Sequence, residues 1–463
     1  MYGPILNISP YREIVGSEGV ATRPPWKSSA EWPWHGAKLT VTPRNVDEVV
    51  QTMRQAIKDG LPVVPAGGGT GYSGGVTSPN GGIILDMRRM NRVLDVDRNL
   101  CLVRTEAGIT ISELNQYLDS FGMWWPHDPG SRAMATVGGA ISVRGVGTYF
   151  TRYGAAPDMV YGLTVVLSDG TLLRLDPRSK GRVTGYDLLS LLVSAEGTLG
   201  LVTEAVLKIW PQPEFREVRL IAFRSLEEVE DYVRAMLEEG VTPEAFLVES
   251  RERLTYEFEW QNVSQDRLQS SLEDSLWIVI FSFAGRQFSV APAIARATAV
   301  AEAHGGRPVH DVTVIQAYWE RKTKKLTTER TTIPSYHVAD FGMPGPDFRS
   351  LERIYSETTA RFHLRRKGVR FYVAWPMGDL VCSAQVFYDE NDVSSTRRAL
   401  EWNRAVAYEV AKHGGTISTI LGIGVRLAEV LEAERTPIEL EVMKKLKAVF
   451  DPKGRMNPGK LLP

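Results

Sequence analysis

A glycine-dense segment, residues 65–75 (PAGGGTGYSGG), is the part of the sequence best suited to bind an anion. It directly follows a short apolar run, residues 61–64, that is typical of a strand. Glycines allow successive backbone N–H groups to point into one concavity, and such a concavity binds phosphate or pyrophosphate. Turns and linkers are also rich in glycine, so this segment alone does not identify a site.

Two further glycine-containing loops indicate that the first does not act alone. Residues 128–131 (DPGS) and 136–139 (TVGG) form the second loop, and residues 194–200 (SAEGTLG) form the third. Three such loops in one chain predict a large ligand that is held at several points.

These loops and the C-terminal segment 451–462 (DPKGRMNPGKLL) resemble the vanillyl-alcohol oxidase/PCMH family of FAD enzymes, in particular its branch of D-lactate dehydrogenases and glycolate oxidases. The resemblance covers most of residues 40–210. In the family the first loop binds the FAD pyrophosphate, the second passes beside the flavin and the third completes the cleft. The resemblance therefore implies FAD as cofactor and an α+β fold, with a PCMH-type two-subdomain FAD-binding domain and a ferredoxin-like substrate (cap) domain.

The FAD contacts that the resemblance implies fall in the three loops, in short stretches that follow them and at the C-terminus. They are Pro65, Gly67, Gly68, Gly69, Thr70, Gly71, Tyr72, Ser73, Pro129, Gly130, Ser131, Thr136, Val137, Gly138, Gly139, Ser142, Tyr153, Glu196, Gly197, Gly200, Val202, Asn457 and Lys460. Thr70 occupies the position at which members with covalent FAD often carry a histidine, so we expect noncovalent FAD. Without the surrounding MNPG motif, Lys460 would be interpreted as a solvated tail lysine.

Two motifs that supply a divalent-metal site and a histidine base in the lactate/glycolate branch are altered here. The HAGDGNLH motif reads PMGDLVCS over residues 376–383, and the GEHG motif reads TILG over residues 419–422. Proline, serine, isoleucine and leucine cannot replace a metal-bound imidazole. We therefore predict no catalytic metal, and the base of the family must be replaced by another group.

Four residues are candidates for the catalytic site. Arg321 in the segment YWERK resembles the arginine that clamps the substrate carboxylate in 2-hydroxy-acid dehydrogenases, and its planar fork suits that task. A solvated arginine on a basic helix is the alternative. Histidine titrates near neutral pH, so His337 is a candidate general base, although a lone histidine is more often structural. Tyr372 and Trp375 are expected to line the pocket, and Tyr153 is expected near the flavin ring.

The function that the resemblance implies is oxidation of a small 2-hydroxy acid, with D-lactate favoured. No Gly-x-Gly-x-x-Gly motif opens a helix inside a βαβ unit, so the expected electron acceptor is a quinone, a cytochrome or another redox protein, or oxygen. Three alternatives remain: an alcohol or phenol oxidase of the vanillyl-alcohol branch, an alkylglycerone-phosphate synthase, and an FAD subunit of a glycolate-oxidase-like complex. The synthase's C-terminal histidine cluster has no match in this chain.

Composition excludes several other classes of protein. The chain has 463 residues, 54 of them basic and 55 acidic, so no basic field predicts nucleic-acid binding. No apolar run approaches the roughly 20 residues of a membrane helix, and no signal peptide is evident, so we expect a cytoplasmic protein, with peripheral membrane attachment left open. The two cysteines are too few for an iron–sulfur cluster. Homodimer and hetero-oligomer both remain open.

The pattern of elements predicts an N-terminal arm (1–40), a PCMH-type FAD-binding domain (41–213), a cap (214–418) and a C-terminal return to the FAD-binding domain (419–463). Helices are predicted over 45–60, 110–122, 225–240, 291–304 and 394–413, two of them behind capping boxes. Strands are predicted over 61–64, 82–86, 101–105, 163–167, 171–175, 218–223, 245–249, 276–283, 371–374 and 381–388. Helices against an antiparallel sheet are expected for the cap.

The absence of a histidine at Thr70 predicts that all flavin leaves the protein on denaturation. Acid or heat should release FAD completely into the supernatant, which absorbance and chromatography would detect. Flavin that stays on the polypeptide would contradict the noncovalent assignment.

Overall fold

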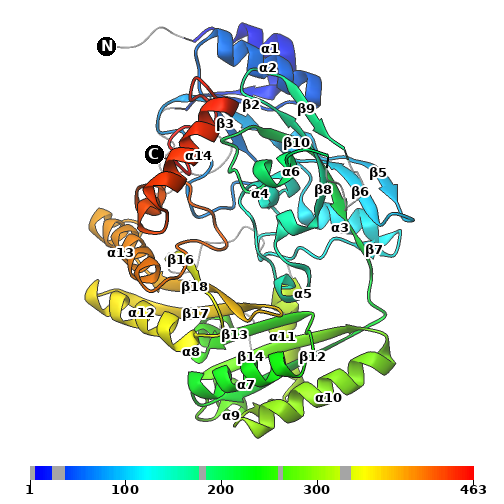
Figure 1. Cartoon of the computed structure of the whole chain (residues 1–463), viewed down its shortest axis with the longest axis vertical. Coiled ribbons are helices and arrows are strands. Elements are labelled where there is room, and N and C mark those ends of the chain that lie inside the picture. The colour runs from blue at the N-terminus through cyan, green and yellow to red at the C-terminus, as the bar shows by residue number, and fades with distance from the viewer. Residues whose placement is uncertain (1–5, 23–36, 177–183, 259–263, 324–334, 463) are drawn as a thin grey trace.

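The computed structural model describes residues 6–22, 37–176, 184–258, 264–323 and 335–462, without the side chains of residues 257, 265 and 320–323. Within this part of the chain, no helix is long and apolar enough to cross a membrane. Figure 1 shows two smaller sheets in the upper half of the molecule and a seven-stranded sheet in the lower half.

The first small sheet carries the glycine-rich loop. Its strand order is β1-β2-β4-β3, and β4 pairs in parallel with β2 and β3. The bounds are β1 (Val20–Ala21), β2 (Ala37–Val41), β3 (Val63–Ala66) and β4 (Gly82–Asp86), with α1 (Ser9–Val15) and α2 (Val46–Lys58) beside them. Asn45 caps α2 as predicted, and the Tyr11 hydroxyl donates to Asp59 at 2.8 Å. The prediction of an irregular arm is therefore wrong for α1, β1 and β2, which pack into this layer.

The second small sheet is antiparallel, with the order β5-β6-β10-β8-β9. Its bounds are β5 (Val93–Asp97), β6 (Leu102–Glu106), β8 (Val160–Val166), β9 (Leu172–Leu175) and β10 (Leu201–Lys208). The predicted β8–β9 hairpin and the Thr110 capping box of α3 (Ile111–Asp119) are both present. The short elements of this half are β7 (Met123–Trp124), α4 (Val137–Ser142), α5 (Phe150–Tyr153), α6 (Leu188–Leu192) and β11 (Trp210–Pro211).

The seven-stranded cap sheet is antiparallel throughout, in the order β15-β12-β14-β13-β17-β18-β16. Its bounds are β12 (Phe215–Phe223), β13 (Ala245–Ser250), β14 (Trp277–Gly285), β15 (Arg307–Pro308), β16 (Tyr336–Met343), β17 (Arg365–Ala374) and β18 (Asp379–Phe387). The predicted fold class, an FAD-binding domain of two subdomains with a ferredoxin-like cap, is confirmed by this arrangement.

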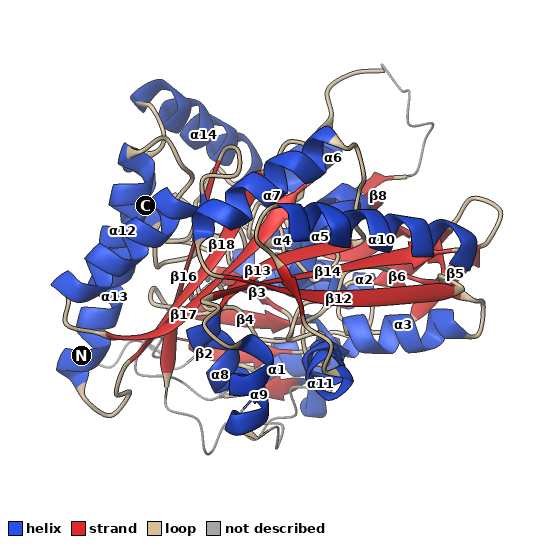
Figure 2. Ribbon diagram, turned by 90° about the horizontal axis from the view of Figure 1, so that it is seen from below, coloured by secondary structure: helices blue, strands red, loops and turns tan. Residues whose placement is uncertain are grey.

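Helices cover both faces of the cap sheet, as Figure 2 shows. One face packs against α7 (Leu226–Glu238), α10 (Gln287–Ala303), α12 (Phe348–Arg361) and α13 (Val393–Lys412). Part of the other face packs against α8 (Arg251–Phe258), α9 (Gln265–Leu272) and α11 (Val312–Thr323). The rest of that second face meets the predicted FAD-binding domain, where Val381 of the cap packs with Val146 and Ala155.

The chain then returns to the first sheet through η6 (Ala428–Ala433) and α14 (Pro437–Phe450). Met456 forms a parallel bridge with Val63, and the Asn457 amide donates to the Val63 carbonyl at 2.8 Å. We propose the same division at 213/214 and at 418/419 that the sequence predicts. The sequence patterns missed α12 and α14, and they started α10 at residue 291, whereas the helix begins at Gln287 with Pro292 inside it.

Candidate flavin and substrate site

Loop 1 (residues 67–75) leaves the end of β3 and lies directly against loop 2 (residues 128–142). A Cβ atom built on Gly67 would lie 2.2 Å from Oγ1 of Thr136, and one built on Gly68 would lie 1.8 Å from the carbonyl oxygen of Met134. Both distances are far below van der Waals contact, so only glycine allows the two loops to meet here.

The tip of loop 1 presents backbone donors to an open space. Within the described residues, the amides of Gly69, Thr70 and Gly71 donate to no protein acceptor. Gly71 is exposed, and a Cβ atom there would meet nothing within 4 Å. Backbone amides are normally paired, so three adjacent unpaired amides at an open turn suit a bound anion. These residues fit the pyrophosphate of the predicted FAD.

Loop 2 places a short helix beside loop 1. The Thr136 hydroxyl caps α4 by accepting a hydrogen bond from the Gly139 amide at 3.3 Å, and the Val137 amide donates to the Ile109 carbonyl at 3.0 Å. A Cβ atom on Gly138 would lie 2.8 Å from Cβ of Ala107, so this glycine is needed for close packing. Earlier in the loop, the predicted contacts Pro129, Gly130 and Ser131 lie in a partly exposed segment that can face a ligand.

Loop 3 (residues 194–200) closes the other side through a buried carboxylate. Glu196 accepts hydrogen bonds from the amides of Ile423 and Gly424 at 2.7 and 2.8 Å. Burial outweighs these hydrogen bonds and raises the pKa of Glu196. Gly197, with φ +70°, packs against Pro65 of β3. Loop 3 therefore fastens the C-terminal return onto loop 1.

The C-terminal motif locks the same corner. The Asn457 side chain donates to the Glu196 carbonyl at 2.7 Å, and Lys460 Nζ donates to the Thr77 carbonyl at 2.8 Å and to Asn457 Oδ1 at 3.2 Å. Lys460 is buried, and burial lowers the pKa of Lys460 to about 8. Lys460 is therefore not a solvated tail residue, and its hydrogen bonds support the predicted role in closing the cleft.

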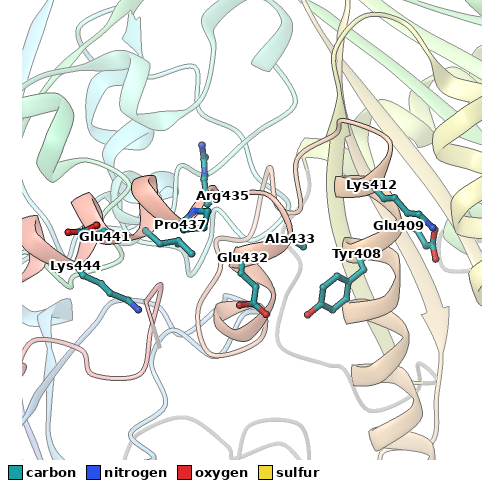
Figure 3. Close-up of a pocket in the computed structure, with 10 residues that line it drawn as sticks. Tyr408, Glu409, Lys412, Glu432, Ala433, Arg435, Pro437, Glu441 and Lys444 are labelled. Atoms are coloured by element: carbon teal, nitrogen blue, oxygen red, sulfur yellow. The ribbon is translucent and has the colours of Figure 1, made fainter.

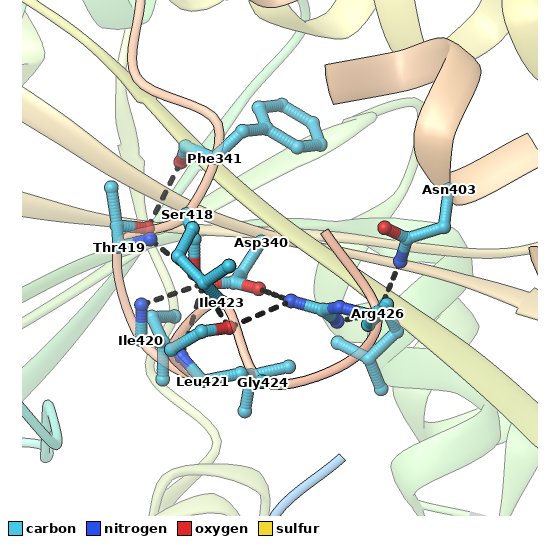
Figure 4. Close-up of polar contacts among 12 residues, drawn as sticks. Asp340, Phe341, Asn403, Ser418, Thr419, Ile420, Leu421, Ile423, Gly424 and Arg426 are labelled. Carbon is cyan, nitrogen blue, oxygen red and sulfur yellow. Dashed lines mark hydrogen bonds and ion pairs between the residues drawn. The ribbon is translucent and has the colours of Figure 1, made fainter. Parts of the chain in front are cut away.

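A second buried carboxylate holds residues 418–421 on the cap (Figure 4). Asp340 Oδ2 accepts hydrogen bonds from the amides of Thr419, Ile420 and Leu421 at 2.7, 2.7 and 3.0 Å, and from the Ser418 hydroxyl at 2.8 Å. The segment that replaces the family's GEHG motif is thus organised around one carboxylate.

Arg426 completes the environment of Asp340. Its guanidinium donates to Asp340 Oδ1 at 2.5 Å and to the Val338 carbonyl at 2.8 Å, and both charged side chains are almost fully buried. Burial alone would raise the pKa of Asp340, but the charge of Arg426 and the backbone hydrogen bonds outweigh it and lower that pKa.

Strand register puts four polar residues in one row across the cap sheet. Asp340 of β16 lies opposite Ser383 of β18, Ser383 opposite Arg370 of β17, and Arg370 opposite Glu249 of β13. Residues directly opposite one another share a face of the sheet. Asp340 binds residues 419–421 and Glu196 binds the adjacent Ile423 and Gly424, so the Asp340 end of this row lies toward the glycine-rich loops.

The middle of the row is a buried charged cluster. The Arg370 guanidinium donates to Glu249, which also accepts from the Tyr318 hydroxyl at 2.6 Å, and Arg253 donates to the Ser383 carbonyl at 3.0 Å. Burial opposes the charged form of Arg370, but the charge of Glu249 more than offsets it and raises the pKa of Arg370. Burial and the neighbouring Arg370 charge lower the pKa of Arg253. Two guanidinium forks beside one carboxylate can recognise a carboxylate ligand.

Comparison with known proteins supports the interpretation of the loops. A family model described as FAD binding domain matches residues 37–176, and one described as FAD linked oxidases, C-terminal domain, matches residues 212–461, more than half of the chain. The chain belongs to the FAD-linked oxidase family. Its cofactor is FAD, which confirms the predicted resemblance, while the noncovalent attachment stays a prediction.

Individual relatives align with nearly the whole length of this chain. It is 30% identical to a probable mitochondrial D-lactate dehydrogenase of Danio rerio over 98% of this chain and 91% of that protein. It is 25% identical to glycolate oxidase subunit GlcD of Bacillus subtilis (strain 168) over 91% of this chain and 88% of that protein. The solved 4-ethylphenol oxidase from Gulosibacter chungangensis shares the fold, with TM-score 0.80 at 20% identity over 98% of this chain and 96% of that one.

The predicted FAD residues are only partly brought together. Loops 1, 2 and 3 meet as described, and the Tyr72 hydroxyl lies 3.1 Å from the Tyr336 hydroxyl of the cap. A Cβ atom on Gly200 would lie 2.6 Å from the Val165 side chain, and Val202 pairs with Val165, so both positions serve packing against β8. Tyr153 packs edge-on against the rings of Trp124 and Trp210, and its place near the flavin ring stays a prediction.

The catalytic candidates have different outcomes. The backbone of Arg321 lies in α11, but its side chain lies outside the described residues. His337 is fully buried on the face of β16 opposite to Asp340, where it packs edge-on to Trp402 and lies 3.1 Å from the Asn403 amide nitrogen. Because successive strand residues point to opposite faces, we no longer assign His337 as general base.

Of the two residues expected to line the pocket, Trp375 borders a cavity and Tyr372 packs in an apolar cluster. Tyr372 packs with Val381 and Ile420 against the FAD-binding domain. Trp375 lines a cavity of about 690 Å³ between the domains, together with Phe150 and Arg152 of α5. The positions of the resembled histidines and glutamate now hold Pro376, Ser383, Ile420 and Leu421. The described residues contain no cluster of three metal-ligating side chains.

Sequence reasoning missed Arg370, Arg253, Glu249 and Asp340 as parts of the site. Asp340 and Arg370 each stand inside a strand, where a charged residue among apolar neighbours was the available indication. A buried charge in a strand requires a partner, but the sequence does not name the partner.

Gly68→Ala should destabilise the apoprotein, because the new Cβ would overlap the Met134 carbonyl, which belongs to the backbone and cannot swing away. Gly71→Ala is the matched control, since its Cβ would meet no atom. We expect a lower Tm, by several degrees or more, for the first variant only. Equal melting temperatures for both variants would contradict the packing of loops 1 and 2.

Asp340→Asn should cost about 3–5 kcal/mol at pH 7, because it leaves Arg426 buried without its counter-ion. The pKa of Asp340 is lowered by folding, so its contribution is complete above the unfolded pKa, near 3.9, and is lost as the pH falls through the folded value. The difference between wild type and variant in urea unfolding should therefore shrink below about pH 4. Asp392→Asn is the control, since Asn caps α13 as well as Asp does. Equal stabilities of the two variants at pH 7 would argue against the Asp340 anchor.

Proposed function

We propose that this protein oxidises a small 2-hydroxy acid, D-lactate being the favoured substrate, to the 2-oxo acid, and that its electrons pass to a quinone, a cytochrome or another redox protein rather than to a nicotinamide. The observation that supports this proposal most is the position of Arg370. Arg370 lies opposite Ser383, and Ser383 stands where the resembled lactate/glycolate motif has a histidine. The Asp340 end of the same row lies toward the glycine-rich loops. The names of the D-lactate dehydrogenase and glycolate oxidase relatives support this substrate class.

Each group of the cluster has a distinct task in this proposal. Arg370 and Arg253 bind the substrate carboxylate through guanidinium forks, in place of a divalent metal. The hydroxyl of Tyr318 and the carboxylate of Glu249 hold the Arg370 fork in position. The apolar side chains of Val381 and Ile420 exclude water beside it. FAD, when bound, would supply the acceptor for the hydride of the substrate carbon, and the proton of the substrate hydroxyl would pass to a general base.

Arg321 remains a second candidate for the carboxylate anchor. It follows Tyr318 and Trp319 on α11, and Tyr318 contacts Glu249 of the cluster. Arg370 is bonded to Glu249, and substitution of each arginine in turn distinguishes the two candidates.

An alcohol or phenol oxidase is the second candidate function. It is favoured by the apolar cluster of Val146, Ala155, Val381, Tyr372 and Ile420, which covers the cap face where the relatives carry metal ligands. An uncharged aromatic alcohol would need such a wall and no guanidinium.

Anaerobic flavin bleaching by a substrate panel tests the function. D-lactate or another small 2-hydroxy acid should reduce the wild-type flavin, and 4-alkylphenols should not. The opposite pattern would favour the oxidase, and no bleaching by either class would favour a catalytically idle FAD subunit.

Arginine variants test the anchor. Arg370→Met combined with Glu249→Gln removes both charges of the pair, so neither is left buried alone, and kcat/KM for the acid should fall about a hundredfold or more at unchanged FAD content. The single variant Arg370→Lys should retain only part of the wild-type kcat/KM, because a lysine lacks the bidentate fork. Arg286→Met, at an exposed arginine, is the control. An unchanged kcat/KM in the double variant, with a loss in Arg321→Met, would move the anchor to Arg321.

A further inference from the structure

Helix α14 exposes a continuous apolar stripe. Ile438, Val442, Leu446 and Val449 are 68%, 51%, 36% and 76% exposed, and their spacing of three and four residues puts them on one side of the helix. The opposite side faces the protein, where Leu440 packs against the C-terminal core and Lys447 donates to the Thr198 carbonyl at 2.7 Å. A soluble helix normally turns its apolar side inward, so this stripe needs a partner.

The charges of α14 change sign along its axis. Glu439 and Glu441 lie in its N-terminal half, and Lys444 and Lys445 lie in its C-terminal half. Glu441 and Lys445 flank the stripe on one side and form an ion pair at 2.6 Å. A helix that is acidic at one end and basic at the other is complementary to an antiparallel copy of itself.

One antiparallel register satisfies the apolar and the charged residues together. If Val442 packs against Leu446 of a second copy, Ile438 comes opposite Val449, and Glu441 comes opposite Lys445. The sequence midpoint of each pair falls between residues 443 and 444. One two-fold axis can therefore relate all three pairs. A two-fold axis through that point repeats each contact twice, as an isologous interface requires.

We propose that a second copy of this chain docks antiparallel on the α14 stripe to form a homodimer. A groove of about 1040 Å³ borders the stripe on the Glu441 side (Figure 3). Tyr408, Lys412 and Glu432 line its far wall, so the second copy meets polar side chains there, as at the rim of an interface. The helix is about 21 Å long at 1.5 Å per residue, so one helix pair buries less than a standard interface, and a micromolar Kd is expected.

Sedimentation of the full-length, FAD-loaded protein from about 1 to 200 µM tests the dimer. The wild type should shift from monomer to dimer over this range. Val442→Glu should abolish the shift at unchanged FAD content and Tm, while Val393→Glu, at an exposed valine that begins α13, should leave it unchanged. A wild type that stays monomeric at 200 µM, with or without a fall in the Tm of Val442→Glu, would overturn the proposal.

A charge swap tests the partner and the register. Glu441→Lys and Lys445→Glu should each weaken dimerisation about tenfold or more at low salt, because each places like charges opposite one another across the two-fold axis. The double variant carries both swapped charges in each copy, so it should recover most of the affinity. Failure of the double variant to recover, while it remains folded and loaded with FAD, would exclude the antiparallel self-pairing.

Discussion

Two buried carboxylates, Glu196 and Asp340, hold one short segment between the FAD-binding domain and the cap. Glu196 binds the amides of residues 423 and 424, and Asp340 binds those of residues 419–421. A buried carboxylate that lacked such donors would be too costly to keep charged. The two groups differ because only Asp340 has a guanidinium in direct contact, which lowers its pKa, whereas burial raises the pKa of Glu196.

The way in which residues 419–424 are held allows their side chains to differ from those of the resembled branch while their backbone stays in place. Residues 419–421 are held by their backbone amides, so their side chains are free to vary. Ile420 stands where the lactate/glycolate branch has a metal ligand, and it packs with Val381 and Tyr372 instead. The proposed replacement for the metal is Arg370 on the neighbouring strand. A guanidinium stays charged and offers directional donors, which suits recognition of a carboxylate.

Much of the local structure could be predicted from the sequence. The caps at Asn45, Thr110 and Ser225 are formed as predicted, because each involves groups three residues apart. The helix α14 was missed although it also begins with a capping box, at Thr436. Its apolar residues recur at helical spacing, so the sequence pattern was sufficient to predict the helix, but not that this apolar side would face solvent. The N-terminal α1 was missed because it is only seven residues long.

The glycine-rich loops, the FAD cofactor and the family were determined by the sequence itself, because their indications are contiguous residues whose backbone must bind an anion. The substrate side was decided only by the tertiary structure. Glu249, Asp340, Arg370 and Ser383 are far apart in the chain, and only the register of four strands puts them in one row. His337 is three residues from Asp340, yet the alternation of a strand turns it to the opposite face. Sequence proximity suggested a site residue, and the pleat of the sheet excluded it.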